Sequence, residues 1–232
     1  VSNTLDYGKF YIQETTEYMR QSLKVWAELG FSFDVVSTGM ILSAEQAALV
    51  SDFCEQSAKK GALVFVDPIM GDEGKLYNGV GEETVAHMRK MVAVADCIVP
   101  NYTEAAYLAD VPYHEDMTEE EARALTIRLH EMGAKSVVVT SAKVDGENCV
   151  VGYDGTEGEF FRIPFDLIPV RFVGTGDIFA AVMLGRLVDG VPLQESTHRA
   201  MDAVRTMIDR NRDKEDKYLG IPIETCLEVL DE

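Results

Sequence analysis

The sequence has few basic residues. Its 232 residues include 21 Lys and Arg against 40 Asp and Glu, which gives a formal net charge of -19 at pH 7. A surface with this excess of negative charge is repelled by nucleic-acid backbones and by anionic lipid headgroups. We therefore expect no nucleic-acid partner and no membrane partner. A small phosphate-bearing ligand is still compatible, because a local cradle and a divalent metal can hold phosphates in an acidic protein.

Paired cysteines and long apolar runs are also missing. Cys54, Cys97, Cys149 and Cys226 are far apart and form no C-x-x-C pair, which predicts reduced thiols in a cytoplasmic protein. No apolar run approaches membrane-spanning length, and no signal-peptide pattern is present. The chain begins at Val1 rather than Met, and its first residues resemble the end of a strand or loop, so we expect that an N-terminal strand region is missing.

What the sequence does contain is a regular alternation of short apolar runs and helical patterns, within a composition that is 47% hydrophobic. Short continuous apolar runs are typical of parallel strands covered on both faces. The fold class expected is α/β, a three-layer α-β-α sandwich with a mostly parallel central sheet, in a single domain over residues 1–232. Strands are expected at 33–37, 62–66, 97–99 and 136–139, with a hairpin at 149–153 and 159–165. Helices are expected at 15–29, 43–60, 82–95, 103–108, 118–133, 192–210 and 223–230, and one more opens within the run Gly174 to Gly185.

Polar clusters follow the expected strands, where parallel sheets bind their ligands. They are Thr38-Gly39, Asp67 to Asp72, Asn101 with Glu104, Thr140-Ser141, and Gly174 to Asp177. Any one cluster is compatible with ordinary turn chemistry. Their common placement at one edge of the sheet favours a binding site.

The segment Gly174-Thr175-Gly176-Asp177 opens an apolar helix that we expect to be buried. Glycines and free N–H groups at a helix start attract anions. Asp177 is either an ordinary helix-start residue or an acid with a task beside a bound anion, such as accepting a proton.

Phosphoryl transfer fits these residue types. Asp67, Asp72 and Glu104 offer the hard oxygen ligands that magnesium accepts, and Asp177 fits the acceptor of a nucleophile's proton. The G-x-x-x-x-G-K-[ST] loop is absent, and Phe179 stands where a dinucleotide motif needs its third glycine. A dinucleotide fold is therefore disfavoured.

Four segments together resemble the pyridoxal kinase family of the ribokinase-like superfamily. They are Asp67-Pro68-Ile69-Met70-Gly71-Asp72-x-Gly74-Lys75-Leu76-Tyr77, Pro100-Asn101-x-x-Glu104-Ala105, Val139-Thr140-Ser141, and Gly174-Thr175-Gly176-Asp177-x-Phe179-Ala180-Ala181. The likeness runs in order from about residue 26 to residue 210. It implies ATP-dependent phosphorylation of the 5′-hydroxyl of pyridoxal, pyridoxine or pyridoxamine by a homodimer.

The resemblance also implies roles for individual residues. Asp177 would be the general base, with Gly174, Thr175 and Gly176 as the anion hole. ATP would meet Asp72, Asn101, Glu104, Thr140 and Ser141; Mg²⁺ would be served by Glu104 and Asp72, and a monovalent cation such as K⁺ by Asp67 and Thr140.

The chain departs from the family pattern on the substrate side. Ser2 and Thr4 lie in the segment that corresponds to the family's substrate lid, Met40 replaces an aromatic residue, and Val99 stands where a threonine often provides a cation ligand. Two alternatives therefore stay open. One is a kinase for hydroxymethylpyrimidine or another small alcohol, and the other is a ligand-binding homologue without catalysis.

Overall fold

A six-stranded sheet with the order β1-β2-β5-β6-β7-β8 forms the centre of the computed structural model, which describes residues 11, 13–77 and 79–230. The strands are β1 (Val35–Thr38), β2 (Leu63–Val66), β5 (Cys97–Ile98), β6 (Ser136–Val144), β7 (Glu147–Asp154) and β8 (Glu159–Pro164). The pairs from β1 to β6 are parallel, and β7 and β8 extend the sheet in antiparallel fashion. The predicted mostly parallel α/β sheet is confirmed.

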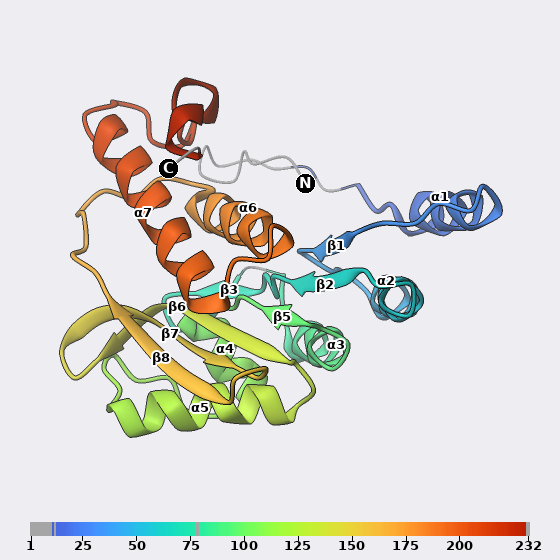
Figure 1. The fold of residues 1–232 in the computed structure, drawn as a ribbon, viewed down its shortest axis with the longest axis horizontal. Coiled ribbons are helices and arrows are strands. Elements are labelled where there is room, and N and C mark those ends of the chain that lie inside the picture. The colour runs from blue at the N-terminus through green and yellow to red at the C-terminus, as the bar shows by residue number, and fades with distance from the viewer. Residues whose placement is uncertain (1–10, 12, 78, 231–232) are drawn as a thin grey trace.

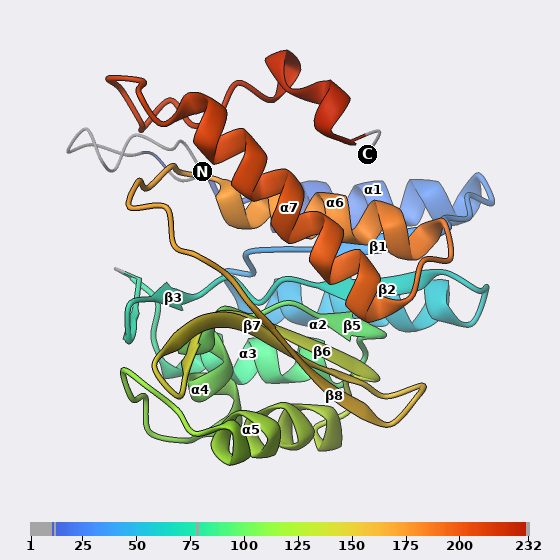
Figure 2. The same cartoon turned by 60° about the vertical axis from the view of Figure 1, so that its left-hand side comes forward.

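Helices cover both faces of this sheet. The helices α2 (Ala44–Ala58), α3 (Glu82–Val92), α4 (Tyr102–Ala109) and α5 (Glu119–Glu131) lie on one face, and α6 (Thr175–Val188) and α7 (Leu193–Asn211) lie on the other (Figure 1 and Figure 2). Helix α1 (Thr16–Glu28) lies beyond β1, at the far end of the sheet. Right-handed crossovers between successive parallel strands explain why α2 to α5 share one face.

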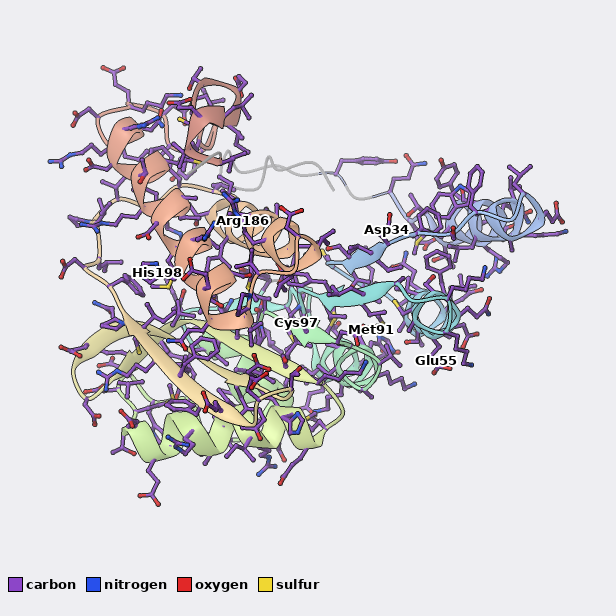
Figure 3. All side chains as sticks on the ribbon, in the orientation of Figure 1. Asp34, Glu55, Met91, Cys97, Arg186 and His198 are labelled. Atoms are coloured by element: carbon purple, nitrogen blue, oxygen red, sulfur yellow. The ribbon has the colours of Figure 1, made fainter. Side chains whose placement is uncertain are left out.

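The parallel strands are apolar on both faces, and alternate residues enter different cores. Val64, Val66 and Ile98 pack toward α2 to α5, whereas Phe65 and Cys97 pack toward α6 and α7. Successive strand side chains point to opposite faces, so a continuous apolar run supplies both cores. Met91 of α3 and Cys97 of β5 lie in the interior, while Asp34 and Glu55 lie toward the β1 end (Figure 3).

Most of the predicted helix starts are confirmed. Ser43 caps α2 by accepting the Gln46 N–H, and Thr118 caps α5 in a reciprocal capping box with Glu121. The helix expected from Thr103, itself a common cap residue, begins earlier, because Asn101 caps α4. The predicted last helix is a pair of short 3₁₀ helices, Ile223–Thr225 and Leu227–Leu230.

The expectation that α6 is buried all round is also wrong. Ile178, Phe179 and Met183 are buried, but Ala181 and Gly185 are exposed on the opposite side of the helix. Helix α6 packs on the sheet and on α7 through one face, and its small residues line the face toward solvent.

All four cysteines are buried with free thiols. Across residues 11, 13–77 and 79–230, no helix combines the length and the hydropathy needed to cross a membrane.

Candidate active site

Gly174 ends the segment that follows β8 and begins α6. Its φ of 83° lies in the left-handed region, which favours glycine. Its carbonyl accepts the Ile178 N–H, and no side chain caps the helix start. The first N–H groups of α6, at Thr175, Gly176 and Asp177, therefore have no intrahelical acceptor. This is the arrangement that helix starts use to hold anions.

The carboxylates of Asp67 and Asp177 lie near this helix start, close enough for their charges to interact. Burial raises the pKa of Asp67 to about 7, and the charge of Asp177 acts in the same direction. Asp177 itself is exposed in the first turn of α6. Among the described residues, no group donates a hydrogen bond to the Asp67 carboxylate. The pair thus presents uncompensated negative charge beside an anion-binding helix end, where a cation is favoured.

Helix α4 clamps a small hairpin, β3 (Gly71–Asp72) and β4 (Lys75–Leu76), against the site. Glu104 Oε1 accepts the N–H groups of Met70 at 3.0 Å and Gly71 at 3.4 Å, and Oε2 accepts that of Asn101 at 2.9 Å. The Asn101 amide donates to the Gly71 carbonyl at 2.8 Å. Burial raises the pKa of Glu104 to about 8, although the three N–H donors oppose this shift.

The same helix explains why Thr103 is not the cap. The Thr103 hydroxyl accepts the Gly74 N–H at 2.8 Å, which fixes the tip of the hairpin. A Cβ at Gly71 would lie 2.5 Å from the Lys75 carbonyl oxygen, so the hairpin closes only around glycine. Residues 70–76 are therefore held in place by the first turn of α4.

Thr140 and Ser141 lie beside Asn101 at the end of the parallel part of β6. Thr140 forms a parallel bridge with Asn101, and its N–H donates to the Pro100 carbonyl at 3.0 Å. The β6–β7 register shifts between Val139 and Ala142, and Ser141 has a φ of 55°. This irregularity turns the backbone at the sheet edge, as bulges near active sites commonly do.

A magnesium ion fits the donor chemistry of this edge only in part. Both Glu104 oxygens already accept backbone N–H groups, whereas no residue in the described part of the chain donates to the Asp67 carboxylate. Over the part of the chain that the structure describes, no group of three or more His, Cys, Asp or Glu side chains is placed to hold a metal ion. Magnesium usually takes one or two carboxylates together with water and substrate phosphates. Asp72 and Asp67 could supply these carboxylates.

The remaining predicted residues are placed as follows. Met40 is exposed just after β1, and Ser2 and Thr4 lie outside the described residues. Thr38 belongs to a predicted polar cluster, and Arg171 joins the site although the sequence analysis did not select it. The Thr38 hydroxyl, at the end of β1, is buried and has no partner among the described residues, and Arg171 forms ion pairs with Asp72 and Glu73.

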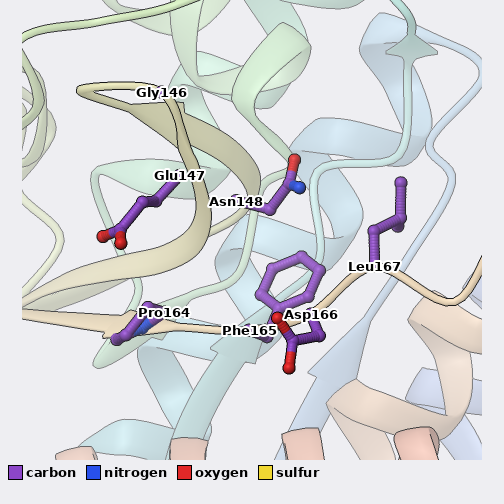
Figure 4. Close-up of a pocket in the computed structure, with 7 residues that line it drawn as sticks. All are labelled: Gly146, Glu147, Asn148, Pro164, Phe165, Asp166 and Leu167. Carbon is purple, nitrogen blue, oxygen red and sulfur yellow. The ribbon is translucent and has the colours of Figure 1, made fainter.

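A separate cavity of about 400 Å³ lies at the start of β7 and the end of β8. Phe165 and Asp166, on the segment after β8, lie opposite the Gly146–Asn148 stretch (Figure 4). None of the predicted site residues that the structure describes lines it.

The raised pKa of Asp67 predicts a pH-dependent stability. Its ordinary pKa is about 4, so between about pH 4 and pH 7 the folded chain holds a proton that the unfolded chain has released. The free energy of unfolding therefore falls as the pH rises through this window, by at most about 1.4 kcal/mol per pH unit.

We expect the ligand-free Asp67→Asn variant to be more stable than the parent at pH 8, with a gap that narrows toward pH 4–5. Urea unfolding at several pH values measures this, with Asp34→Asn, an exposed site before β1, as the control. Equal pH slopes for parent and Asp67→Asn would contradict the assignment of the shift to Asp67.

The fold and the site define the class. The fold, a mostly parallel sheet between two helical layers, is similar to that of a Bacteroides thetaiotaomicron protein provisionally named a phosphomethylpyrimidine kinase. That structure has a TM-score of 0.93 at 32% identity and covers 98% of this chain and 79% of its own. A Lactobacillus plantarum pyridoxal kinase gives a TM-score of 0.84 at 27% identity, with 97% and 81% covered. The chain is a ribokinase-like α/β protein.

The family follows from the sequence comparisons. The pattern of the phosphomethylpyrimidine kinase family matches residues 3–220, and the chain belongs to this family of phosphotransferases. Pyridoxal kinase of Arabidopsis thaliana is 33% identical over 171 residues, 70% of this chain and 53% of the relative. Pyridoxal kinase of Sus scrofa is 34% identical over 171 residues, 66% of this chain and 52% of the relative. The chain thus spans about half the length of these curated relatives.

Proposed function

We propose that this chain is an ATP-dependent kinase that phosphorylates the 5′-hydroxyl of a B6 vitamer, within a single kinase domain. The observation that carries the proposal is the placement of Asp177 in the first turn of α6, directly after free backbone donors and close enough to Asp67 to raise its pKa. The pyridoxal kinase relatives support it, and so does a form of the Bacteroides protein described with pyridoxal, which is 32% identical.

In the proposed reaction, Asp177 accepts the proton of the substrate hydroxyl while the hydroxyl oxygen attacks the terminal phosphorus of ATP. The bond from that phosphorus to the bridging oxygen breaks, and ADP leaves. The N–H groups at the start of α6 stabilise the charge on the transferring group. Asn101, Glu104, Thr140 and Ser141 shape the nucleotide side. A magnesium ion bound with the phosphates would neutralise charge, and Asp72 and Asp67 are the residues available to hold it; K⁺ beside Asp67 and Thr140 belongs to the same proposal.

We further propose that the chain works as a homodimer. Helix α1 and its C-terminal cap residue expose several large apolar side chains, Tyr18, Val25, Trp26 and Leu29. Clusters of this kind on a surface are typical of protein interfaces. Sedimentation velocity should then report twice the 25.7 kDa mass of one chain, and a monomer at all concentrations would refute it.

A kinase for hydroxymethylpyrimidine is the second candidate. It is supported by the family pattern itself and by a thiamine biosynthesis bifunctional protein of Geobacter sulfurreducens, 30% identical over 169 residues. Met40, exposed at the end of β1 in place of an aromatic residue, also leaves the choice of ring open.

Side-by-side turnover decides between the candidates. ADP release by the full chain is measured with pyridoxal, pyridoxine, pyridoxamine and hydroxymethylpyrimidine, each at several concentrations. The proposal expects the highest kcat/KM with a B6 vitamer. A higher value with the pyrimidine would select the second candidate, and ATP binding without turnover of any substrate would indicate a non-catalytic homologue.

A further inference from the structure

Arg171 lies three residues before the glycine that starts α6. Its guanidinium contacts the β3–β4 hairpin through Nη1 to Glu73 Oε1 at 3.0 Å and Nη2 to Asp72 Oδ2 at 3.4 Å. Its side chain is 72% exposed. The contact joins two segments of the candidate site, the hairpin and the approach to Gly174, that are nearly one hundred residues apart in the sequence.

The surroundings of Arg171 are strongly acidic. Five carboxylates gather at this edge of the sheet: Asp67, Asp72, Glu73, Glu104 and Asp177. Within the described residues, Arg171 is the only cationic side chain in an ion pair with any of them. A nucleoside triphosphate that enters this site meets mainly negative side chains, so the cation that pairs with them has a large part in whether the anion binds.

The backbone around Arg171 is held in place by a buried neighbour, whereas the Arg171 guanidinium is exposed to solvent. Phe172 is buried in a cluster with Ile178 of α6 and Met207 of α7, and the ammonium of Lys217 lies 5.5 Å from the Phe172 ring centroid. The base of Arg171 is thereby fixed beside the helix start. Exposed ion pairs contribute little to stability, so the guanidinium can exchange its carboxylate partners at small cost.

We propose that Arg171 is a phosphate ligand for the nucleotide, which exchanges Asp72 and Glu73 for the β- and γ-phosphates of ATP. A guanidinium binds phosphate oxygens in bidentate geometry, and the β- and γ-phosphates together carry more negative charge than one exposed carboxylate. The exchange also frees the Asp72 carboxylate for a magnesium ion carried by the phosphates. This proposal rests on the proposed kinase function, but not on which alcohol is phosphorylated.

The test measures nucleotide binding without any alcohol substrate. Dissociation constants for ATP, ADP and AMP are determined by isothermal titration calorimetry for the parent, Arg171→Ala, Arg171→Lys and the control Arg199→Ala, whose guanidinium pairs with Glu195 on α7. We expect Arg171→Ala to weaken ATP binding on the order of 10-fold and to leave AMP binding within about 2-fold. Arg171→Lys should recover part of the loss, and Arg199→Ala should bind like the parent.

Glu73→Gln separates phosphate binding from a purely structural latch. Glu73 is exposed and competes for the guanidinium, so the proposal expects Glu73→Gln to bind ATP more tightly than the parent. A latch that only holds the hairpin in place predicts weaker or unchanged binding, which would overturn the proposal. Equal losses for ATP and AMP in Arg171→Ala, or unchanged ATP binding, would also overturn it.

The outcomes for the two proposals are separable. If Arg171→Ala loses ATP affinity as expected while no B6 vitamer is turned over, only the substrate assignment fails. If vitamers are turned over and ATP binding does not depend on Arg171, only the role of Arg171 fails. If the parent chain binds no ATP, both fail.

Discussion

Replacement of Asp177 by Asn lowers kcat by about 10²–10⁴-fold, the range expected when a positioned general base is lost. The amide keeps the shape of the side chain in the first turn of α6 but cannot accept the substrate proton. Because the free N–H groups at the helix start are unchanged, ATP binding should remain or improve slightly. Initial rates of ADP formation with saturating substrate, together with calorimetric ATP binding, check both expectations.

Asp189→Asn is the matched control for this experiment. Asp189 lies at the other end of the same helix, as its C-terminal cap residue, so the change of charge is equal and the distance from the candidate site is a helix length. We expect kcat within about 2-fold of the parent, as for surface substitutions remote from a site. Equal activity of Asp177→Asn and Asp189→Asn would rule out Asp177 as the base.

Glu104→Ala should cost on the order of 3 kcal/mol in the free energy of unfolding. The residue is 3% exposed, and its carboxylate accepts three backbone N–H groups, those of Met70, Gly71 and Asn101. Its removal leaves buried donors without acceptors, at about 1–3 kcal/mol for each such group, and part of this is recovered if water enters. Urea unfolding monitored by circular dichroism measures the loss.

Glu121→Ala provides the comparison. Glu121 occupies the same place in the capping box of α5 that Glu104 occupies in that of α4. Its box is exposed to water, so we expect a loss of about 1 kcal/mol or less. Similar losses in the two variants would mean that Glu104 serves only as a helix cap and does not hold the hairpin.

The sheet was predictable because its strands are apolar on both faces. Val64-Phe65-Val66 and Val137-Val138-Val139 have no polar alternation, and this pattern requires cover on each side. The error at α6 has a related origin. Its alanines and glycines count as apolar in composition, yet Ala181 and Gly185 occupy the exposed face, since small side chains are tolerated in water.

The cap of α4 shows how local signals compete. Asn101 and Glu104 have the spacing of a capping box, and Thr103 is also a common cap residue. In the structure the Thr103 hydroxyl does not cap the helix, because it accepts a hydrogen bond from the N–H of Gly74, nearly thirty residues earlier. Such long-range contacts leave no periodic trace in the sequence.

The candidate site divides in the same way. The positions of Asp67, Asn101 and Thr140 follow from parallel strands that end at one edge, so their proximity could be predicted, while their chemical roles stay predictions. The ion pairs of Arg171 could not be predicted from the sequence, because they depend on how the segment after β8 passes the β3–β4 hairpin. A lone cation directly before the Gly174 segment was the available signal.

The strand order also bears on how the chain is made. Each strand of the main sheet lies next to the one that precedes it in that sheet along the chain, so the sheet can grow as the polypeptide leaves the ribosome. Helices α2 to α5 are synthesised between the strands that they cover. Phe65, Val99 and Val138 stay uncovered until α6 and α7 have been synthesised. A nascent chain that has not reached residue 175 therefore carries a bare apolar sheet face. The same late segment brings Asp177, so the last half of the core and the proposed base are acquired in one step of synthesis.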